Sequence, residues 1–331
     1  MKIFVNAVSA KKGGAKTILE GFIQSVNSDG QNTYVVYAGF NFEGIVPDNV
    51  KWVYHPKEGI DAFLFNTLWS FFFMAMERAE VILSFNNINT VIPCRKVTYF
   101  HQLKVLDVSD RSIKSKFLRA YYACIKSDNI IVQTHIVKEK FVSMLSYDYN
   151  KVEVVWPGIK PVDIRDRSMF LHSSVKRFIL VPYTDISSAH KNFDFVLKCL
   201  NVVPSDFVFL VTTTSMDSNL DERIHFIGNV SKEELFQLYA DAEFVLFPSM
   251  LETIGLPIFE AVSIGSNVVV YDAEYIREFE KEYNFHGLVK KVSCPEEIFS
   301  TDGILNSNIE GLKDFRCGQW DKLIDQFNKF N

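Results

Sequence analysis

The stretch from Glu252 to Glu260 combines two carboxylates with a glycine beside an expected helix start. Pro257 suits a first helical position, so Glu252 should precede the helix and Glu260 should lie in its first turn. Such a helix start presents unpaired backbone amides and the positive end of the helix dipole, so Gly255 and Leu256 can approach an anion such as a diphosphate. The eight-residue spacing directs the two carboxylates to different parts of one ligand, one to a ribose diol and the other to a sugar hydroxyl.

A simpler interpretation needs no ligand. Acids at a helix N-terminus are each stabilised by the helix dipole by about 0.3–1 kcal/mol. Taken alone, Glu252 and Glu260 favour this interpretation, so their chemistry depends on what the rest of the chain places beside them. Lys191 and His101 also follow expected strands. A lysine or lone histidine there is more often structural, but ligands bind where parallel strands end, which favours a function for Lys191.

Short runs rich in β-branched and aromatic residues alternate with helix-length segments, a pattern typical of βαβ units. Helices are expected over residues 15–26, 61–78, 112–124 and 137–145, and Ser231 and Glu234 are spaced for a capping box that opens another. The expected strands begin at Lys2, Thr33, Val50, Val81, Lys96, Asn129 and Lys151, and then at Phe178, Phe207, Ile224, Glu243, Ser266 and Leu288. The predicted fold class is α/β, with two Rossmann-like doubly wound domains that face each other across a cleft.

A Pro-Gly pair, Pro157-Gly158, closes the first series of strands and marks a domain boundary. We predict an N-terminal acceptor-side domain over residues 1–158 and a nucleotide-sugar-binding domain over 159–310. Residues 311–331 should form a C-terminal helix that returns to the first domain. A chain of 331 residues suits two domains.

The composition is that of a globular protein, with 48% apolar and 23% charged residues, and it excludes disorder, collagen and a coiled coil as the main state. Residues 1–155 carry 18 Lys/Arg against 14 Asp/Glu, and the remainder carry 17 against 26. A basic cluster interleaved with aromatic residues indicates either an anionic partner or a solvated helix. Its members are Lys104, Arg111, Lys114, Lys116, Arg119 and Lys126.

The most apolar run of the chain, residues 60–76, is interrupted by Asp61, Asn66, Thr67 and Ser70. It is shorter than the roughly 20 apolar residues that span a bilayer, so a buried or partly interfacial helix is expected. The five cysteines form no Cys-x-x-Cys pair, and the short apolar segment at the N-terminus is too brief for a signal peptide. These features favour a cytoplasmic protein.

Several stretches resemble retaining glycosyltransferases of family 4, which adopt the GT-B fold. The stretch from Glu252 to Glu260 is similar to that family's motif of two glutamates separated by seven residues. Further similar stretches occur in family order across nearly the whole chain. They are Lys11-Lys12-Gly13-Gly14-Ala15, Tyr99-Phe100-His101, Asp128–Val132, Val154–Gly158, His190-Lys191-Asn192, and Phe226–Gly228 through Tyr239–Asp241.

The resemblance implies transfer of a sugar from a nucleotide-diphosphate donor to a glycan or lipid-linked acceptor, with retention of configuration. It assigns contacts with the donor sugar to Glu252, the ribose to Glu260 and the diphosphate to Lys191, with His101 near the sugar. Donor contacts are also expected from Gly13, Gly14, Thr253, Ile254, Gly255 and Leu256. Neither a metal nor another cofactor is expected, because GT-B enzymes generally work without a divalent ion and the seven histidines show no helical metal-site pair.

The chain departs from the family pattern at Tyr183, where an arginine usually ends the strand. A phenol cannot replace the bidentate grip of a guanidinium on phosphate, so Lys16 or another cation must compensate or activity is lowered. A Walker loop is excluded because Lys16 lacks the required glycines, and no Gly-x-Gly-x-x-Gly follows a strand. The remaining alternative is a non-catalytic GT-B module that binds a sugar nucleotide, a glycan or a partner.

The aromatic and basic first domain suits a lipid-diphosphate-linked glycan at the inner face of the cytoplasmic membrane. We therefore expect a role in bacterial surface polysaccharide synthesis, such as O-antigen, capsule or lipopolysaccharide, with peripheral membrane contact. No nucleic acid is expected as a partner.

Overall fold

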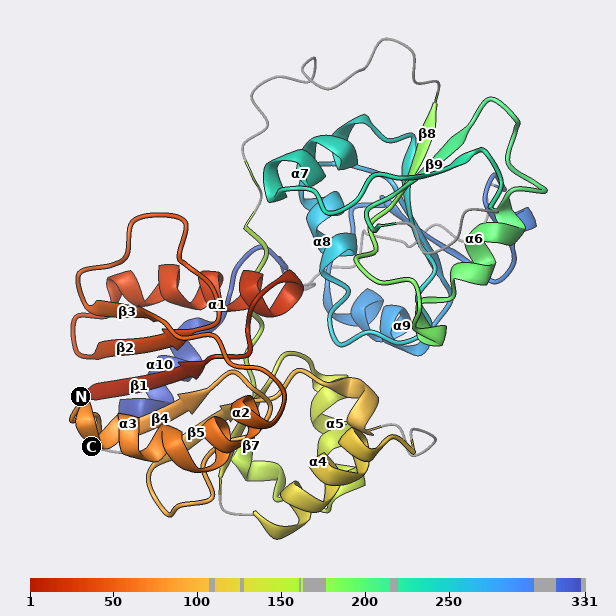
Figure 1. Cartoon of the computed structure of the whole chain (residues 1–331). Coiled ribbons are helices and arrows are strands. Elements are labelled where there is room, and N and C mark those ends of the chain that lie inside the picture. The colour runs from red at the N-terminus through yellow and green to blue at the C-terminus, as the bar shows by residue number, and fades with distance from the viewer. Residues whose placement is uncertain are drawn as a thin grey trace. The chain divides into compact units, whose positions relative to one another are not determined.

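The computed structural model describes residues 1–106, 111–125, 128–160, 162, 177–214, 220–300 and 314–328. The chain divides into two compact units. The first unit contains Met1–Gly158 and Gly318–Asn331, and the second contains Ile159–Cys317. Within each unit, strands form a layer with helices on its faces (Figure 1). This is the predicted α/β architecture with doubly wound sheets, which is confirmed.

The first unit has a seven-stranded parallel sheet in the order β3-β2-β1-β4-β5-β6-β7. The order reverses between β1 and β4, which makes this edge the switch point where doubly wound sheets bind ligands. The strands are β1 (Lys2–Ala7), β2 (Thr33–Ala38), β3 (Val50–Tyr54), β4 (Val81–Ser84), β5 (Lys96–Tyr99), β6 (Asn129–Val132) and β7 (Val152–Val154). Of the strand expected to begin at Lys151, only the three residues Val152–Val154 lie in the sheet.

Helices cover both faces of this sheet. They are α1 (Gly13–Ser25), α2 (Gly59–Leu64), α3 (Ser70–Met76), α4 (Ile113–Cys124), α5 (His135–Leu145) and α10 (Trp320–Asn328). A π turn, Phe65–Trp69, joins α2 to α3. Phe65 and Met74 pack with Phe4 on one face. On the other, Phe22 of α1 contacts Trp320 of α10, with ring centroids 5.4 Å apart.

The second unit has a six-stranded parallel sheet in the order β10-β9-β8-β11-β12-β13. Its strands are β8 (Phe178–Val181), β9 (Val208–Val211), β10 (Ile224–Phe226), β11 (Phe244–Phe247), β12 (Val268–Tyr271) and β13 (Val289–Val292). Its helices are α6 (Phe193–Cys199), α7 (Lys232–Asp241), α8 (Leu256–Ser263) and α9 (Glu274–Glu282). Here the switch point lies between β8 and β11, so the loops that follow these two strands are neighbours.

A local signal in the sequence explains where α7 begins. The predicted capping box at α7 is present: Glu234 donates its backbone N–H to Oγ of Ser231, and Ser231 donates its own to the Glu234 carboxylate. Within the described residues, one helical segment, Gly59–Met76, is long and apolar enough to cross a membrane, and 33% of it is buried.

Candidate active site

The candidate site of the second unit is built from the two loops at its switch point. After β11, residues 248–255 lead into α8, and after β8 a loop leads through Lys191 to α6. Backbone contacts hold the loops together: Met250 N–H donates to the His190 carbonyl at 2.8 Å, and the Asn192 side-chain amide donates to the Pro248 carbonyl at 3.2 Å. The two predicted motifs therefore lie side by side.

Lys191 and Glu252 form a direct ion pair. Nζ of Lys191 lies 2.5 Å from Oε1 of Glu252, and the two side chains are 22% and 15% exposed. Both side chains were predicted to contact a ligand, but in this structure each offsets the charge of the other. A charge-assisted hydrogen bond at this depth is stronger than one in water, so the pair holds the site in a defined arrangement.

Tyr183 provides an aromatic surface for Lys191. Its ring is buried, and Nζ of Lys191 lies 5.1 Å from the Tyr183 centroid and 5.6 Å from that of Phe247. Both distances permit cation–π attraction. Burial, with the nearby charge of Glu252 among the smaller causes, raises the pKa of the Tyr183 phenol well above its usual value, so the phenol stays neutral. Tyr183 thus positions the lysine but adds no cation of its own.

The start of α8 has no side-chain cap on its backbone amides. Gly255 precedes the helix with φ of +68°, a left-handed conformation that favours glycine, and no side chain caps the helix. Leu256 is its first residue and Pro257 its second. Thr253 and Leu256 are half-buried, but the Ile254 side chain is buried, so only the Ile254 backbone is available to a ligand.

The prediction that Glu260 lies in the first turn of the helix is wrong. The helix begins at Leu256, so Glu260 is its fifth residue, and the first turn contains no acid. The Glu260 side chain is buried, and its Oε2 accepts a hydrogen bond from the Tyr239 hydroxyl at 3.1 Å. Burial raises the pKa of Glu260, while Lys232 and the Tyr239 hydrogen bond oppose the change. The simpler interpretation, in which an exposed acid is stabilised by the helix dipole, therefore does not apply to Glu260.

In the first unit, the predicted glycines and His101 follow strands next to that sheet's switch point. Gly13 begins α1 with φ of +63°, and Gly14 follows in the first turn. His101 donates its backbone N–H to Oδ1 of Asn87 at 2.6 Å, and its Nε2 lies 3.3 Å from the Asn87 side-chain nitrogen. Burial, with a smaller contribution from the charge of Lys114, lowers the pKa of His101 to about 4. The imidazole is therefore neutral at pH 7.

A group of asparagines that the sequence analysis did not predict lies at the same edge. Asn6 and Asn86 both donate side-chain amide protons to Oδ1 of Asn66, each at 2.9 Å. Asn86 also accepts the backbone N–H of Ser9 at 3.1 Å. The available signal was the pair Asn86-Asn87 in the loop directly after an apolar strand, because loops carry a large share of binding residues.

Two further predictions concern cations. Lys16 pairs with Glu43 at 3.1 Å and with Glu20 at 3.8 Å, so its charge is already offset within the first unit. Across the residues that the structure describes, no group of three or more His, Cys, Asp or Glu could hold a metal ion.

The two doubly wound units define a GT-B fold. The WaaG glycosyltransferase of lipopolysaccharide biosynthesis superposes with a TM-score of 0.64 at 17% identity, covering 90% of this chain and 88% of WaaG. Anabaena HepE, solved with UDP and glucose, gives 0.64 at 15% identity, covering 90% and 87%. A sucrose-phosphate synthase from Thermosynechococcus elongatus gives 0.65 at 14% identity, covering 89% and 86%.

Sequence comparison points to the same class. Residues 214–300 match the family model described as glycosyl transferases group 1, which confirms a resemblance to glycosyltransferases and is consistent with family 4. The O-antigen chain mannosyltransferase RfbU of Salmonella typhimurium is 23% identical over 163 residues, 45% of this chain and 44% of RfbU. The D-inositol 3-phosphate glycosyltransferase of Mycolicibacterium smegmatis is also 23% identical over 163 residues, 44% of this chain and 37% of its own length. The chain thus spans less than half of these two relatives.

Proposed function

We propose that the protein is a glycosyltransferase that moves a sugar from a nucleotide-diphosphate donor to a glycan or lipid-linked acceptor with retention of configuration. The observation that carries the proposal is the Lys191–Glu252 pair, 2.5 Å long, beside the start of α8, which no side chain caps. A cation, backbone amides and a carboxylate together fit the two halves of a sugar nucleotide, the anionic diphosphate and the hydroxylated sugar.

In the proposed mechanism the donor separates the ion pair. The diphosphate takes over Lys191 and the amides near Gly255, which frees Glu252 to accept hydrogen bonds from sugar hydroxyls. As the glycosidic bond breaks, negative charge grows on the leaving phosphate, and Lys191 with these amides stabilises it, in the role that a metal ion has in other transferases. The leaving diphosphate takes the acceptor proton on the same face of the sugar, so no protein base and no metal are required.

Glu260 has a separate role in this proposal. Tyr239 donates to Oε2 of Glu260, and Oε1 has no hydrogen bond to a described residue. The tyrosine fixes the carboxylate while the second oxygen accepts a hydrogen bond from a ribose hydroxyl. In the first unit, Gly13 and Gly14 would let the start of α1 approach the phosphates, and neutral His101 would orient a hydroxyl.

We place the reaction in bacterial surface polysaccharide synthesis, at the inner face of the cytoplasmic membrane. Two similar proteins support this context, an O-antigen chain mannosyltransferase and a glycosyltransferase of lipopolysaccharide biosynthesis. HepE was solved with UDP-glucose, which supports a nucleotide sugar as the donor.

The test begins with a thermal-shift screen of nucleotide sugars, followed by transfer assays with the donor that stabilises the protein most. Lys191→Ala and Glu252→Ala should each abolish transfer and leave the fold intact. Lys281→Ala and Glu278→Ala are matched controls, because this 2.8 Å pair is exposed on α9, and they should retain activity. Unchanged turnover in the Lys191 and Glu252 variants would refute the site. Donor binding without any transfer would favour the non-catalytic module.

A further inference from the structure

One side of the helical segment Gly59–Met76 is buried, and it carries three polar residues beside apolar ones such as Phe65 and Met74. Asn66, Thr67 and Ser70 are buried. Asn66 accepts hydrogen bonds from Asn6 and Asn86, and Ser70 donates to the Asn66 carbonyl at 3.1 Å. Asn66, one of the four polar residues that interrupt the apolar run, therefore attaches the helix to β1 and to the loop after β4, whereas Asp61 is exposed.

The opposite side of the same segment is a row of exposed large apolar side chains. Their exposed fractions range from 37% to 76%, and the members are Ile60, Phe63, Leu64, Leu68, Trp69, Phe72 and Met76. Scattered exposed apolar residues are ordinary, but a contiguous row on one helix marks an interaction surface. Asp61 is the only charged residue in the segment.

The π turn helps to keep this row on one side. Ile60, Leu64, Leu68, Phe72 and Met76 are spaced by four residues, and in a regular α-helix such a row drifts by about 40° at each step. The wider turn at Phe65–Trp69 offsets part of that drift. π turns occur frequently at functional sites.

The apolar row continues onto helix α4, which adds positive charge. The rings of Phe63 and Phe117 are in edge contact, with centroids 5.1 Å apart, and Ile113 is 87% exposed. Lys114 and Lys116 are exposed on the same helix and form no ion pair with a described residue. We call the row on Gly59–Met76 together with these α4 residues the apolar-cationic face.

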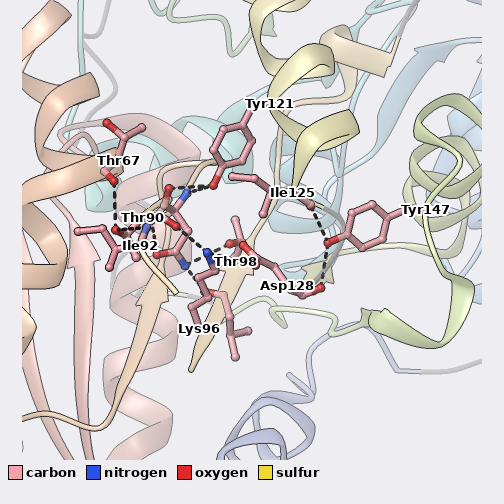
Figure 2. Close-up of polar contacts among 11 residues, drawn as sticks. Thr67, Thr90, Ile92, Lys96, Thr98, Tyr121, Ile125, Asp128 and Tyr147 are labelled. Atoms are coloured by element: carbon pink, nitrogen blue, oxygen red, sulfur yellow. Dashed lines mark hydrogen bonds and ion pairs between the residues drawn. The ribbon is translucent and has the colours of Figure 1, made fainter. Parts of the chain in front are cut away.

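A polar network attaches both parts of this face to the segment between β4 and β5 (Figure 2). The Thr67 carbonyl, within the π turn, accepts hydrogen bonds from the Thr90 hydroxyl at 3.0 Å and from the Val91 N–H at 2.9 Å. Tyr121 of α4 contacts the backbone of the neighbouring Asn89 at 2.8 Å. The apolar side chains are thus displayed from a rigid support.

We propose that the apolar-cationic face docks on a bilayer that contains anionic lipids, with Gly59–Met76 lying in the plane of the membrane interface. Trp69 and the phenylalanines would enter the boundary between headgroups and acyl chains, while Lys114 and Lys116 bind the headgroups. A membrane-spanning arrangement would break the hydrogen bonds of Asn66 to the sheet. A symmetric dimer through this face would bring the two basic helices together, and their like charges disfavour it.

The test is vesicle flotation with equal parts phosphatidylglycerol and phosphatidylcholine, compared with phosphatidylcholine alone. The protein should float with the anionic vesicles, and less so at high salt. Fluorescence should shift to the blue on binding, because Trp69 is 53% exposed, whereas Trp156 and Trp320 are buried and Trp52, on β3, is half-buried. Trp69→Phe should remove this shift and retain binding.

Two variants separate the apolar and the cationic contributions. Leu68→Gln with Trp69→Gln and Phe72→Gln should abolish flotation, and Lys114→Gln with Lys116→Gln should weaken it by about fivefold for each lysine. Ile45→Gln, at a residue that is 95% exposed, is the matched apolar control, and Lys198→Gln with Lys281→Gln is the charge control. Circular dichroism and thermal unfolding would verify that each variant is folded.

Wild-type protein that stays with the soluble fraction would overturn the proposal, as would a triple glutamine variant that still floats. Concentration-dependent self-association that the triple variant loses would assign the face to a second copy instead. The proposal does not rest on sugar transfer: Lys191→Ala should bind vesicles like the wild type. Membrane binding and catalysis can therefore fail separately.

Discussion

Replacing Glu252 by glutamine should tighten the binding of a free nucleoside diphosphate while it abolishes sugar transfer. In the wild type the diphosphate must first separate Lys191 from Glu252, which lie 2.5 Å apart with exposed fractions of 22% and 15%. Glutamine removes the negative charge and keeps the size of the side chain. Lys191 is then available to the phosphates before they bind.

The magnitude follows from the strength of the pair. A hydrogen bond to a charged group contributes about 1.5–3 kcal/mol, and partial exposure of both side chains favours the lower half of that range. About 1.5–2 kcal/mol corresponds to roughly 10- to 30-fold tighter binding. Lys191→Ala changes affinity in the opposite direction, because the phosphates lose their cation.

Isothermal titration calorimetry with UDP, GDP and ADP measures the effect directly. Glu278→Gln is the control, since its partner Lys281 lies on the exposed surface of α9, and it should leave affinity unchanged. The reasoning is refuted if Glu252→Gln binds no more tightly than the wild type. Equal tightening in the Lys191→Ala, Glu252→Gln double variant would also refute it, because the gain must pass through the lysine.

Three further predictions concern stability and can be measured by urea unfolding. Tyr183→Ala should destabilise the second unit by about 3–5 kcal/mol, because it leaves a cavity. Tyr183→Phe keeps the ring beside Lys191 and should destabilise it by less than about 1.5 kcal/mol. Similar losses of stability in both variants would refute the packing role of the ring. Because the pKa of His101 is lowered to about 4 in the folded state, the first unit should lose stability as pH falls from about 6.5 to 4, by on the order of 2 kcal/mol. His101→Gln should remove this dependence, and an unchanged pH profile would contradict the assignment. Lys96→Ala should destabilise the first unit by about 3–5 kcal/mol, because it removes one partner of a buried ion pair, whose other partner Asp128 lies 3.3 Å away. Lys198→Ala, on the surface of the second unit, is the control.

Much of the fold follows from the order of strands and helices in the sequence. Apolar runs such as those at Val81 and Phe244 are buried on both faces, and this continuous pattern identifies parallel strands. The end of a strand is also predictable, which is why Lys191 and Glu252 could be selected as candidates. Their direct pairing depends on β8 and β11 being neighbours, a property of the whole sheet that no local pattern contains.

Two features depended on geometry that spacing does not fix. The helix begins at Leu256, one residue earlier than expected, so Glu260 lies beyond the first turn. At that position its side chain accepts a hydrogen bond from the Tyr239 hydroxyl. The polar residues of Gly59–Met76 read as interruptions of an apolar run, because the partners that bury Asn66 come from two distant strand regions, Asn6 and Asn86. In both cases a tertiary contact decided what the residue does.

The first unit is encoded in two pieces, with the 159 residues of the second unit inserted between Gly158 and Gly318. The two ends of the gap lie together, since Gln319 N–H donates to the Trp156 carbonyl at 2.8 Å. If the insert unfolds first, it becomes a loop that joins the two pieces of the first unit. The entropic cost of closing such a loop grows slowly, by about 0.6 kcal/mol for each doubling of its length. Chain connectivity therefore couples the two unfolding transitions only weakly, and α10 can remain docked on its sheet while the insert has lost its structure.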